Sequence, residues 1–218
     1  MNGFDQWNGK KWYCYGTSMT ANDVTTDYYS GQLAALAGLE EHNFGKGGSG
    51  IVPALHGEDS IKARCMRLDD GKAEADLITV ELIPNDMRAP LGTVIDTGDD
   101  TFCGNLNQIL AYLLENTDAF VAVLIASRGR YDYKDPTVQY PPVSSYTQNR
   151  LAWEAAVETV CAMHGVPCWN GAAEAQLGYH RVCRSDRLVR DQIHLTREGG
   201  RLLAQYYWGR LRQVFPLK

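Results

Sequence analysis

The stretch Lys11-Trp12-Tyr13-Cys14-Tyr15-Gly16-Thr17-Ser18 decides how this chain folds. Its aromatic first part, up to Tyr15, has the composition of a β-strand, and Gly16 marks the turn that ends the strand. Ser18 is therefore expected just beyond the carboxyl end of a strand. Open parallel sheets bind ligands at this edge, so the position of Ser18 is the first indication of a site.

Short β-like runs alternate with helical patterns along the rest of the chain. Further strands are expected near His42–Phe44 and over Asp76–Ile83, Ala119–Ala126 and Val166–Trp169. The expected helices carry Tyr29, Leu33 and Leu36 before a stop at Gly38, Phe102 to Leu114, a segment from a Thr147 N-cap to Gly165, and a segment after a Thr196 N-cap. This alternation predicts an α/β fold, a three-layer α/β/α sandwich around a parallel sheet of about five strands.

One helix is predicted in more detail from its apolar spacing. Between Thr147 and Gly165, the residues expected to face the core are Ala152, Ala156, Val160 and Met163. In the strand over Asp76–Ile83, Pro84 is expected to end the run because proline cannot donate to the sheet ladder.

Length and charge limit the partners of the chain. Its 218 residues, 44% of them hydrophobic, are enough for a sizeable core, and we expect a single domain over residues 1–218. The net charge of -5, with both signs mixed along the chain, offers no basic stripe for a phosphate backbone. We expect no nucleic-acid partner, and the oligomeric state stays open.

The apolar segments predict a soluble protein. The longest run, Ala119–Ala126, is too short to span a bilayer, and the polar Met1–Lys11 lacks a signal-peptide core. The expected location is the cytoplasm by default, or a larger secreted or surface polypeptide of which the chain is a part. The six cysteines are too few for a disulfide framework in a chain of this length, so we expect free thiols.

Four short segments contain residue types that acyl transfer needs. Ser18 could attack a carbonyl, His194 could take its proton, and Asp191 could orient the imidazole. The spacing of three residues lets Asp191 reach Nδ1 of His194 and leaves Nε2 facing the serine. Gly48 and Asn85, with the Ser18 amide, could donate hydrogen bonds to an oxyanion. We predict Ser18, Asp191 and His194 as catalytic residues, and Ser18, Gly48 and Asn85 as the oxyanion hole.

Together these segments resemble the SGNH hydrolases, also called GDSL-type esterases. The matching blocks are Tyr15–Thr20, Asn43–Gly48, Ile83–Asp86 and Asp191–Thr196, which extend over nearly the whole chain. The resemblance implies a flavodoxin-like sheet and ester hydrolysis through an acyl-serine intermediate, with no cofactor and no metal.

The chain departs from the family pattern at two positions. Thr17 stands where the family usually has aspartate before the serine, and Ile83 stands where the third block normally has glycine. Neither change removes a catalytic group. Losing the glycine is expected to narrow the pocket or tilt Asn85.

Two other classes of site have weaker support. The loop Gly45–Gly50 matches the dinucleotide pattern G-x-G-x-x-G with Asp70 downstream, but it follows the second strand and meets Pro53 instead of opening a helix. Possible metal ligands also occur, at spacings that fit no familiar zinc site. These residues are Cys161, His164, Cys168, His180 and Cys183.

The substrate is predicted less closely than the reaction. We expect a small-molecule or polysaccharide ester, with an O-acetyl group on a carbohydrate favoured by the polar and aromatic loops. The alternatives are a lipase or thioesterase of the same fold, or a non-catalytic glycan-binding module. Arg128 and Arg130 could bind an anionic substrate, and Met87–Asp100 is expected to form a rim or lid loop. The aromatic residues in question are Tyr131, Tyr133, Tyr140, Tyr146, Trp169 and Tyr179.

Overall fold

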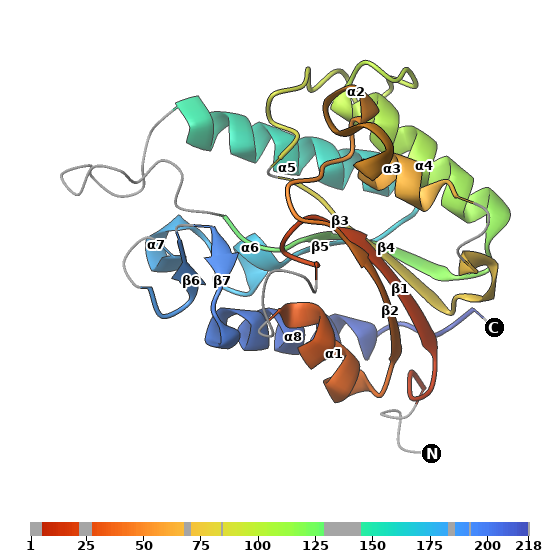
Figure 1. Cartoon of the computed structure of the whole chain (residues 1–218), viewed down its shortest axis with the longest axis vertical. Helices are drawn as coiled ribbons and strands as arrows, with labels where there is room; N and C mark the ends of the chain where they lie inside the picture. The colour runs from red at the N-terminus through yellow and green to blue at the C-terminus, as the bar shows by residue number, and fades with distance from the viewer. Residues whose placement is uncertain are drawn as a thin grey trace.

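Five parallel strands form the centre of the molecule, as the sequence predicts (Figure 1). The structure, a computed structural model, describes residues 6–21, 28–67, 71–83, 85–128, 145–182, 186–191 and 193–217, without the side chains of 145–149, 179 and 180. The sheet order is β2-β1-β3-β4-β5. The strands are β1 Lys11–Gly16, β2 Glu40–Gly45, β3 Leu77–Glu81, β4 Phe120–Ile125 and β5 Cys168–Asn170.

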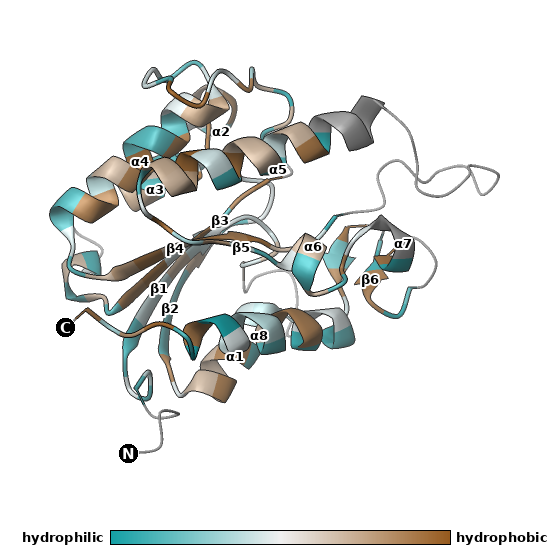
Figure 2. Ribbon diagram, turned by 180° about the vertical axis from the view of Figure 1, so that it is seen from behind, coloured by the Kyte–Doolittle hydropathy of each residue, from teal (hydrophilic) through white to brown (hydrophobic). Residues whose placement is uncertain are grey.

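Helices cover both faces of this sheet, which completes the predicted three-layer sandwich. Helices α1 (Tyr29–Ala37) and α8 (Arg197–Leu211) lie on one face. Helices α3 (Ile61–Cys65), α4 (Phe102–Asn116) and α5 (Ser145–Met163) lie on the other (Figures 1 and 2). The shorter elements are α2 Pro53–His56, η1 Gly57–Asp59, η2 Lys72–Glu74, α6 Gly171–Glu174, α7 Tyr179–Val182, and the antiparallel pair β6 Val189–Arg190 and β7 His194–Leu195.

The side chains of each strand alternate between two apolar cores, because successive residues of a strand point to opposite faces. In β1, Tyr13 and Tyr15 belong to the core beneath α3, α4 and α5. Trp12 and Cys14 belong to the core above α1 and α8. Both faces of the central strands are therefore buried, which explains their nearly continuous apolar sequences.

The structure contains the Gly38 stop and the Thr196 cap that the sequence predicts. Gly38 ends α1 with a φ of +69°, a left-handed conformation that glycine adopts without strain. Thr196 caps α8, where its hydroxyl oxygen accepts a hydrogen bond from Gly199 N–H at 3.2 Å. Thr101 caps α4 in the same way, through Gly104 N–H at 3.1 Å.

The predicted core face of α5 is partly wrong. Ala156 and Val160 are buried, but Ala152 is exposed and the Met163 residue is 54% exposed. The helix begins at Ser145, before the expected Thr147 cap. The buried stripe follows Trp153, whose ring packs on Phe102 with 4.6 Å between centroids, and therefore lies to one side of the predicted one. The other buried residues of that stripe are Val157 and Cys161.

Strand β3 is shorter than predicted and ends at Glu81. Pro84, expected to end it, lies outside the described residues. Just before that position the chain turns at Ile83, which has a φ of +59°. A β-branched residue in this conformation is unusual, and the residue is 1% exposed, so packing in the core holds it there.

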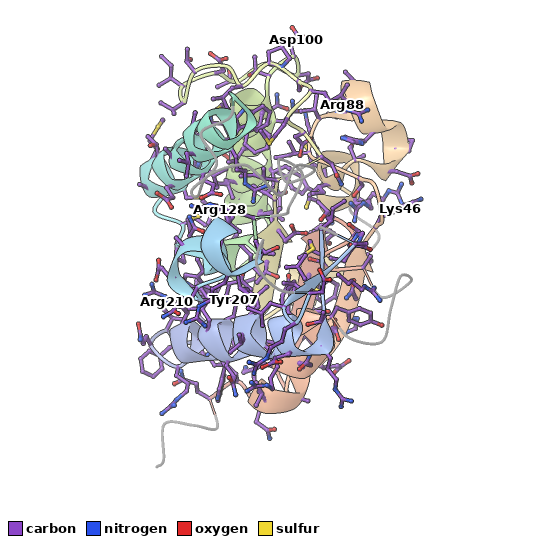
Figure 3. All side chains as sticks on the ribbon, turned by 90° about the vertical axis from the view of Figure 1, so that its left-hand side faces the viewer. Lys46, Arg88, Asp100, Arg128, Tyr207 and Arg210 are labelled. Carbon is purple, nitrogen blue, oxygen red and sulfur yellow. The ribbon has the colours of Figure 1, made fainter. Side chains whose placement is uncertain are left out.

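The register of the strands brings their carboxyl ends to one edge of the sheet. Gly16 of β1 is opposite Gly45 of β2, and Val80 of β3 is opposite Val123 of β4. Figure 3 labels Lys46, which follows β2, and Arg128, which follows β4. The segments that follow β1, β2 and β3, which contain the predicted site residues, therefore start from neighbouring positions.

The segment Met87–Asp100, expected as a rim or lid loop, is tied to α4. The side-chain amide of Asn107 donates to the carbonyls of Val94 at 2.9 Å and Asp96 at 2.7 Å.

No helix in the described part of the chain combines the length and apolar character that crossing a bilayer requires.

Candidate active site

Ser18 lies in a tight turn directly after β1. The carbonyl of Thr17 accepts hydrogen bonds from the N–H groups of Thr20 at 3.1 Å and Ala21 at 3.0 Å, which closes the turn. Gly16 precedes it because a Cβ there would collide with the Thr20 hydroxyl and with Glu81. The Ser18 residue is partly exposed at the carboxyl edge of the sheet.

His194 and Asp191 belong to the small hairpin of β6 and β7. Asp191 occupies its turn with a φ of +44°, a left-handed conformation that aspartate tolerates better than most residues. Its Oδ1 accepts hydrogen bonds from His194 N–H at 3.0 Å and Ile193 N–H at 3.3 Å. The imidazole Nδ1 of His194 lies 2.9 Å from Oδ2 of Asp191. The carboxylate is thus fixed by the backbone of the residues that carry the imidazole.

The hydrogen bonds also set the charge of this carboxyl group. Partial burial by itself would raise the pKa of Asp191, but the hydrogen bonds from the backbone and ring of His194 outweigh it. They hold that pKa below its usual range, so Asp191 is ionised and accepts a hydrogen bond from Nδ1–H of His194. In the neutral form of the imidazole, a hydrogen on Nδ1 leaves Nε2 as the hydrogen-bond acceptor.

The structure brings the other end of the chain to this nitrogen. Nε2 of His194 lies 2.9 Å from Oγ of Ser18, although 176 positions separate the two residues in the sequence. Because Nε2 accepts, the serine hydroxyl donates. The carboxylate, the imidazole and the hydroxyl therefore form one continuous hydrogen-bonded series, the arrangement that activates a serine nucleophile.

The three predicted oxyanion donors lie in adjoining segments. Gly48 is in the exposed loop after β2 and has a φ of +72°. The Asn85 amide donates to the carbonyl of Ser49, the neighbour of Gly48, over 2.6 Å. An amide NH₂ has two hydrogens, so this bond fixes Asn85 beside the Gly48 loop and uses one of them.

No protein-family profile and no curated protein matches the sequence. Solved structures do match. A protein from Lactobacillus plantarum is 26% identical, with a TM-score of 0.78 over 95% of this chain and 99% of its own. A candidate SGNH hydrolase from Slackia heliotrinireducens is 18% identical, with a TM-score of 0.61 over 94% and 100%. An acetyl xylan esterase variant from Geobacillus stearothermophilus is 14% identical, with a TM-score of 0.64 over 94% and 95%.

The chain has the SGNH hydrolase fold. The resemblance predicted from the four sequence segments is thus confirmed at the level of the fold.

Within this SGNH fold, the departure at Thr17 has a physical explanation. The N–H and the hydroxyl of Thr17 both donate to Oε2 of Glu81 at 2.8 Å, and the Thr20 hydroxyl adds a third contact at 3.3 Å. Glu81 is fully buried at the end of β3. An aspartate at position 17 would place a second carboxyl group against this one, whereas threonine donates a hydrogen bond to it.

The burial of Glu81 shifts its ionisation. Loss of solvent raises the pKa of Glu81 to about 7, against hydrogen bonds from Thr17 and Thr20 and the charge of Arg150, which lower it. Its Oε1 is buried without a hydrogen-bond partner among the described residues. Glu81 was not predicted as a site residue, although a charged residue inside the apolar run Asp76–Ile83 was a usable signal.

Asp86 is a second buried carboxyl group whose role was not predicted from the sequence. It is fully buried, and its Oδ1 accepts hydrogen bonds from Ile51 N–H at 2.7 Å and Val52 N–H at 3.2 Å. Nε2 of His56 lies 3.6 Å from the same Oδ1. Asp86 thereby fixes the far end of the loop that begins after β2 and contains Gly48.

This contact also disfavours the nucleotide alternative. In the dinucleotide motif, backbone N–H groups at a helix start bind phosphate. Here the carboxylate of Asp86 already takes the N–H groups of Ile51 and Val52, directly after Gly45–Gly50, and the four-residue α2 follows. Asp70 lies outside the described residues.

The metal alternative gains no support from the described residues, among which no three His, Cys, Asp or Glu side chains are grouped as a metal site. His164 contacts the side-chain oxygen of Asn107 through Nε2 at 2.9 Å. Cys161 and Cys168 are free thiols. Cys183 and the His180 side chain lie outside the described part of the chain.

Several residues considered for substrate binding have other contacts. Arg128 donates from Nε and Nη2 to the buried carboxylate of Glu154, at 3.0 and 2.5 Å, so it is not simply available to an anionic substrate. Trp169 is 5% exposed and belongs to the core. The others lie outside the described residues or side chains: Arg130, Tyr131, Tyr133, Tyr140, Tyr146 and Tyr179.

Proposed function

We propose that this protein is a serine ester hydrolase. The observation that carries the proposal is the unbroken contact from Asp191 through His194 to Ser18 at the carboxyl edge of the sheet. The fold, shared with solved structures that include esterases, supports the same reaction class.

The reaction begins at the Ser18 hydroxyl. His194 Nε2 takes its proton while Oγ attacks the ester carbonyl, and the carbonyl π electrons move onto oxygen to give a tetrahedral oxyanion. Asp191 accepts the hydrogen bond of Nδ1 and stabilises the imidazolium that results. The amides of Ser18 and Gly48 and the second N–H of Asn85 are proposed as oxyanion donors, each worth roughly 3 kcal/mol.

The intermediate collapses when the bond to the alcohol breaks. The leaving oxygen takes the proton from His194, and the acyl group remains on Ser18. Water then attacks the acyl-serine, His194 removes its proton, and collapse of the second intermediate releases the acid and restores the hydroxyl.

The proposed substrate class is an acetyl ester of a carbohydrate. Solved structures of the same fold include two acetyl xylan esterases, AlAXEase and a protein from Geobacillus stearothermophilus, at 16% and 14% identity. The same comparisons include a GDSL-like lipase candidate from Bacteroides ovatus, so a lipase or thioesterase is the second candidate. A glycan-binding module without turnover is the third, since Ile83 changes the segment that carries Asn85.

Hydrolysis of p-nitrophenyl acetate tests the reaction class. The wild type is expected to turn over, and Ser18→Ala is expected to lose all activity above background while its melting temperature stays within a few degrees, because Ser18 is partly exposed and not part of the core. Equal rates for both proteins would refute the proposal.

The substrate class is tested with esters whose acyl groups differ in length. Release of acetate from acetylated xylan, compared with hydrolysis of p-nitrophenyl octanoate and palmitate, separates a carbohydrate acetylesterase from a lipase. Binding of xylan by a folded protein that hydrolyses none of these esters would favour the glycan-binding module.

A further inference from the structure

Arg64 extends a buried guanidinium group beneath the candidate site. It belongs to α3 and is 8% exposed. Its Nη1 donates to the carbonyl of Phe44, near the end of β2. Its Nη2 donates to the carbonyl of Gly16 at 3.1 Å and to the hydroxyl oxygen of Ser49 at 2.7 Å. One side chain thus contacts the ends of two strands and the loop that follows the second.

The charge of this group has no acidic partner in direct contact within the described residues. The Arg64 Nε donates to the backbone carbonyl of Asp59 at 3.1 Å, whereas the Asp59 carboxylate pairs with Lys46 at 2.6 Å. Burial lowers the pKa of Arg64 from its usual range, although a guanidinium stays protonated. A cation buried on carbonyl oxygens is costly, which suggests a role beyond cohesion of the fold.

The segments that Arg64 joins are those that contain the proposed oxyanion donors. Gly16 is two residues before Ser18, and Ser49 directly follows Gly48. The carbonyl of Ser49 in turn accepts the hydrogen bond of the Asn85 amide. The relative placement of all three donors therefore depends on groups that Arg64 holds directly or through Ser49.

We propose that Arg64 is a positioning residue for ester hydrolysis, which fixes the Ser18 turn against the Gly48 loop so that the oxyanion donors converge on one point. This inference rests on the proposed esterase function. The planar fork of arginine suits the task because it reaches several carbonyls in fixed directions, and lysine offers only a point charge.

The test compares Arg64→Met, Arg64→Lys and the control Arg67→Met by kcat and KM for p-nitrophenyl acetate. Arg67 follows α3 on the surface, and its Nη2 lies 3.9 Å from the carboxylate of Glu58. We expect kcat to fall about 100-fold in Arg64→Met with KM changed less than about threefold, because small misplacements of a catalytic group cost this much. Arg64→Lys should recover part of kcat, and Arg67→Met should leave it unchanged.

Ser49→Ala provides a second test, which can still be made if Arg64→Met does not fold. It removes the hydroxyl that Arg64 contacts, and we expect about a tenfold loss of kcat. The double variant Ser49→Ala with Arg64→Lys should lose less than the product of the two separate losses, because both disturb one linkage. Multiplicative losses, or wild-type kcat in Arg64→Lys and Ser49→Ala, would overturn the inference.

The kinetics of the wild type and Ser18→Ala distinguish failure of the proposed esterase function from failure of the Arg64 inference. A folded wild type that hydrolyses no ester, with Ser18→Ala indistinguishable from it, refutes the esterase and the role of Arg64 together. An active wild type and an inactive Ser18→Ala, together with wild-type kcat in Arg64→Met, refute the Arg64 inference alone.

Discussion

A single buried carboxyl group, that of Glu81, ties the nucleophile turn to the centre of the sheet. Its Oε2 holds both the N–H and the hydroxyl of Thr17, the residue directly before Ser18. The position of the proposed nucleophile thus depends on a side chain from β3 that does not reach the surface.

The raised pKa of Glu81 makes stability depend on pH. The pKa is about 7 in the folded chain and 4.5 as the ordinary value, so folding favours the protonated form. The stabilising contribution of the protonated Glu81 side chain is complete below pH 4.5 and is lost as the pH rises through about 7. Glu81→Gln keeps an acceptor for Thr17 without a charge, so its stability relative to the wild type should rise by up to about 3 kcal/mol between about pH 5 and pH 8.

Urea unfolding of both proteins at the two pH values measures this difference, because other ionisable groups are common to both. A stability difference between the two proteins that does not change with pH would contradict the assignment.

Asp191 combines a backbone task and an electrostatic task that one substitution separates. Asn adopts a φ near +44° readily and keeps an oxygen for the N–H groups, but it can present an amide hydrogen to Nδ1 and favour the wrong tautomer of His194. Asp191→Asn is therefore expected to lower kcat by roughly three to four orders of magnitude with little change in melting temperature. Steady-state kinetics check this, and a loss of less than about tenfold would argue against Asp191 as the orienting group.

Two helices start with the same kind of threonine cap, but only one of them adjoins the site. Thr196 caps α8 one residue after β7, which contains His194, and its hydroxyl also donates to the carbonyl of Arg187. Thr101 caps α4, on the opposite face of the sheet. The first cap therefore holds the hairpin as well as the helix.

Thr196→Ala and Thr101→Ala should each cost about 1 kcal/mol of unfolding free energy, because each loses a cap. Only Thr196→Ala should also lower kcat, by several-fold, since its loss loosens the hairpin that places the imidazole. Denaturant unfolding and kcat at low temperature measure both effects. Equal kcat in the two variants would show that the hairpin does not need the cap.

The elements themselves were largely predictable, because their signals are local. The apolar runs of β3 and β4, the Gly38 stop and the Thr196 cap depend on neighbours in the sequence, and the structure confirms them. The face of α5 was predicted only in part, with Ala156 and Val160 buried as expected. The rest was wrong because Trp153 packs on Phe102 of another helix, and spacing alone does not identify such a partner.

The site was predictable only in its reactive groups. Ser18, Asp191 and His194 could be named by residue type and family resemblance, and the structure places them in contact. Glu81 left one signal in the sequence, a charge inside an apolar run, but its partner Thr17 and the supporting roles of Asp86 and Arg64 could not be read there, because these contacts involve backbone groups from distant segments. For Arg64 these are carbonyls, which every residue has.

At the end of the molecule opposite the site, the segment before β1 packs against the end of α8. The indole of Trp7 donates to the carbonyl of Leu211 at 2.9 Å, and the Gln6 amide donates to that of Val214 at 2.6 Å. Trp7 is fully buried. These contacts stabilise the fold without touching the edge of the sheet that carries the candidate site.

Trp7→Phe should therefore lower the unfolding free energy by about 1–3 kcal/mol, through the lost hydrogen bond and lost contact, with kcat unchanged. The partly buried Trp208 of α8 provides the matched control, and Trp208→Phe should cost less. Thermal unfolding and kcat measure the two effects, and a fall in kcat at temperatures where Trp7→Phe is folded would contradict this separation.

The proposed reaction depends on the activation of Ser18 by His194, and covalent labelling tests this activation most directly. The folded wild type, treated with a fluorophosphonate, should gain one phosphonyl adduct that peptide mass spectrometry places on Ser18, and neither Ser18→Ala nor His194→Ala should react at a comparable rate. An unlabelled, folded wild type, or a label on another residue that persists in Ser18→Ala, would contradict the account.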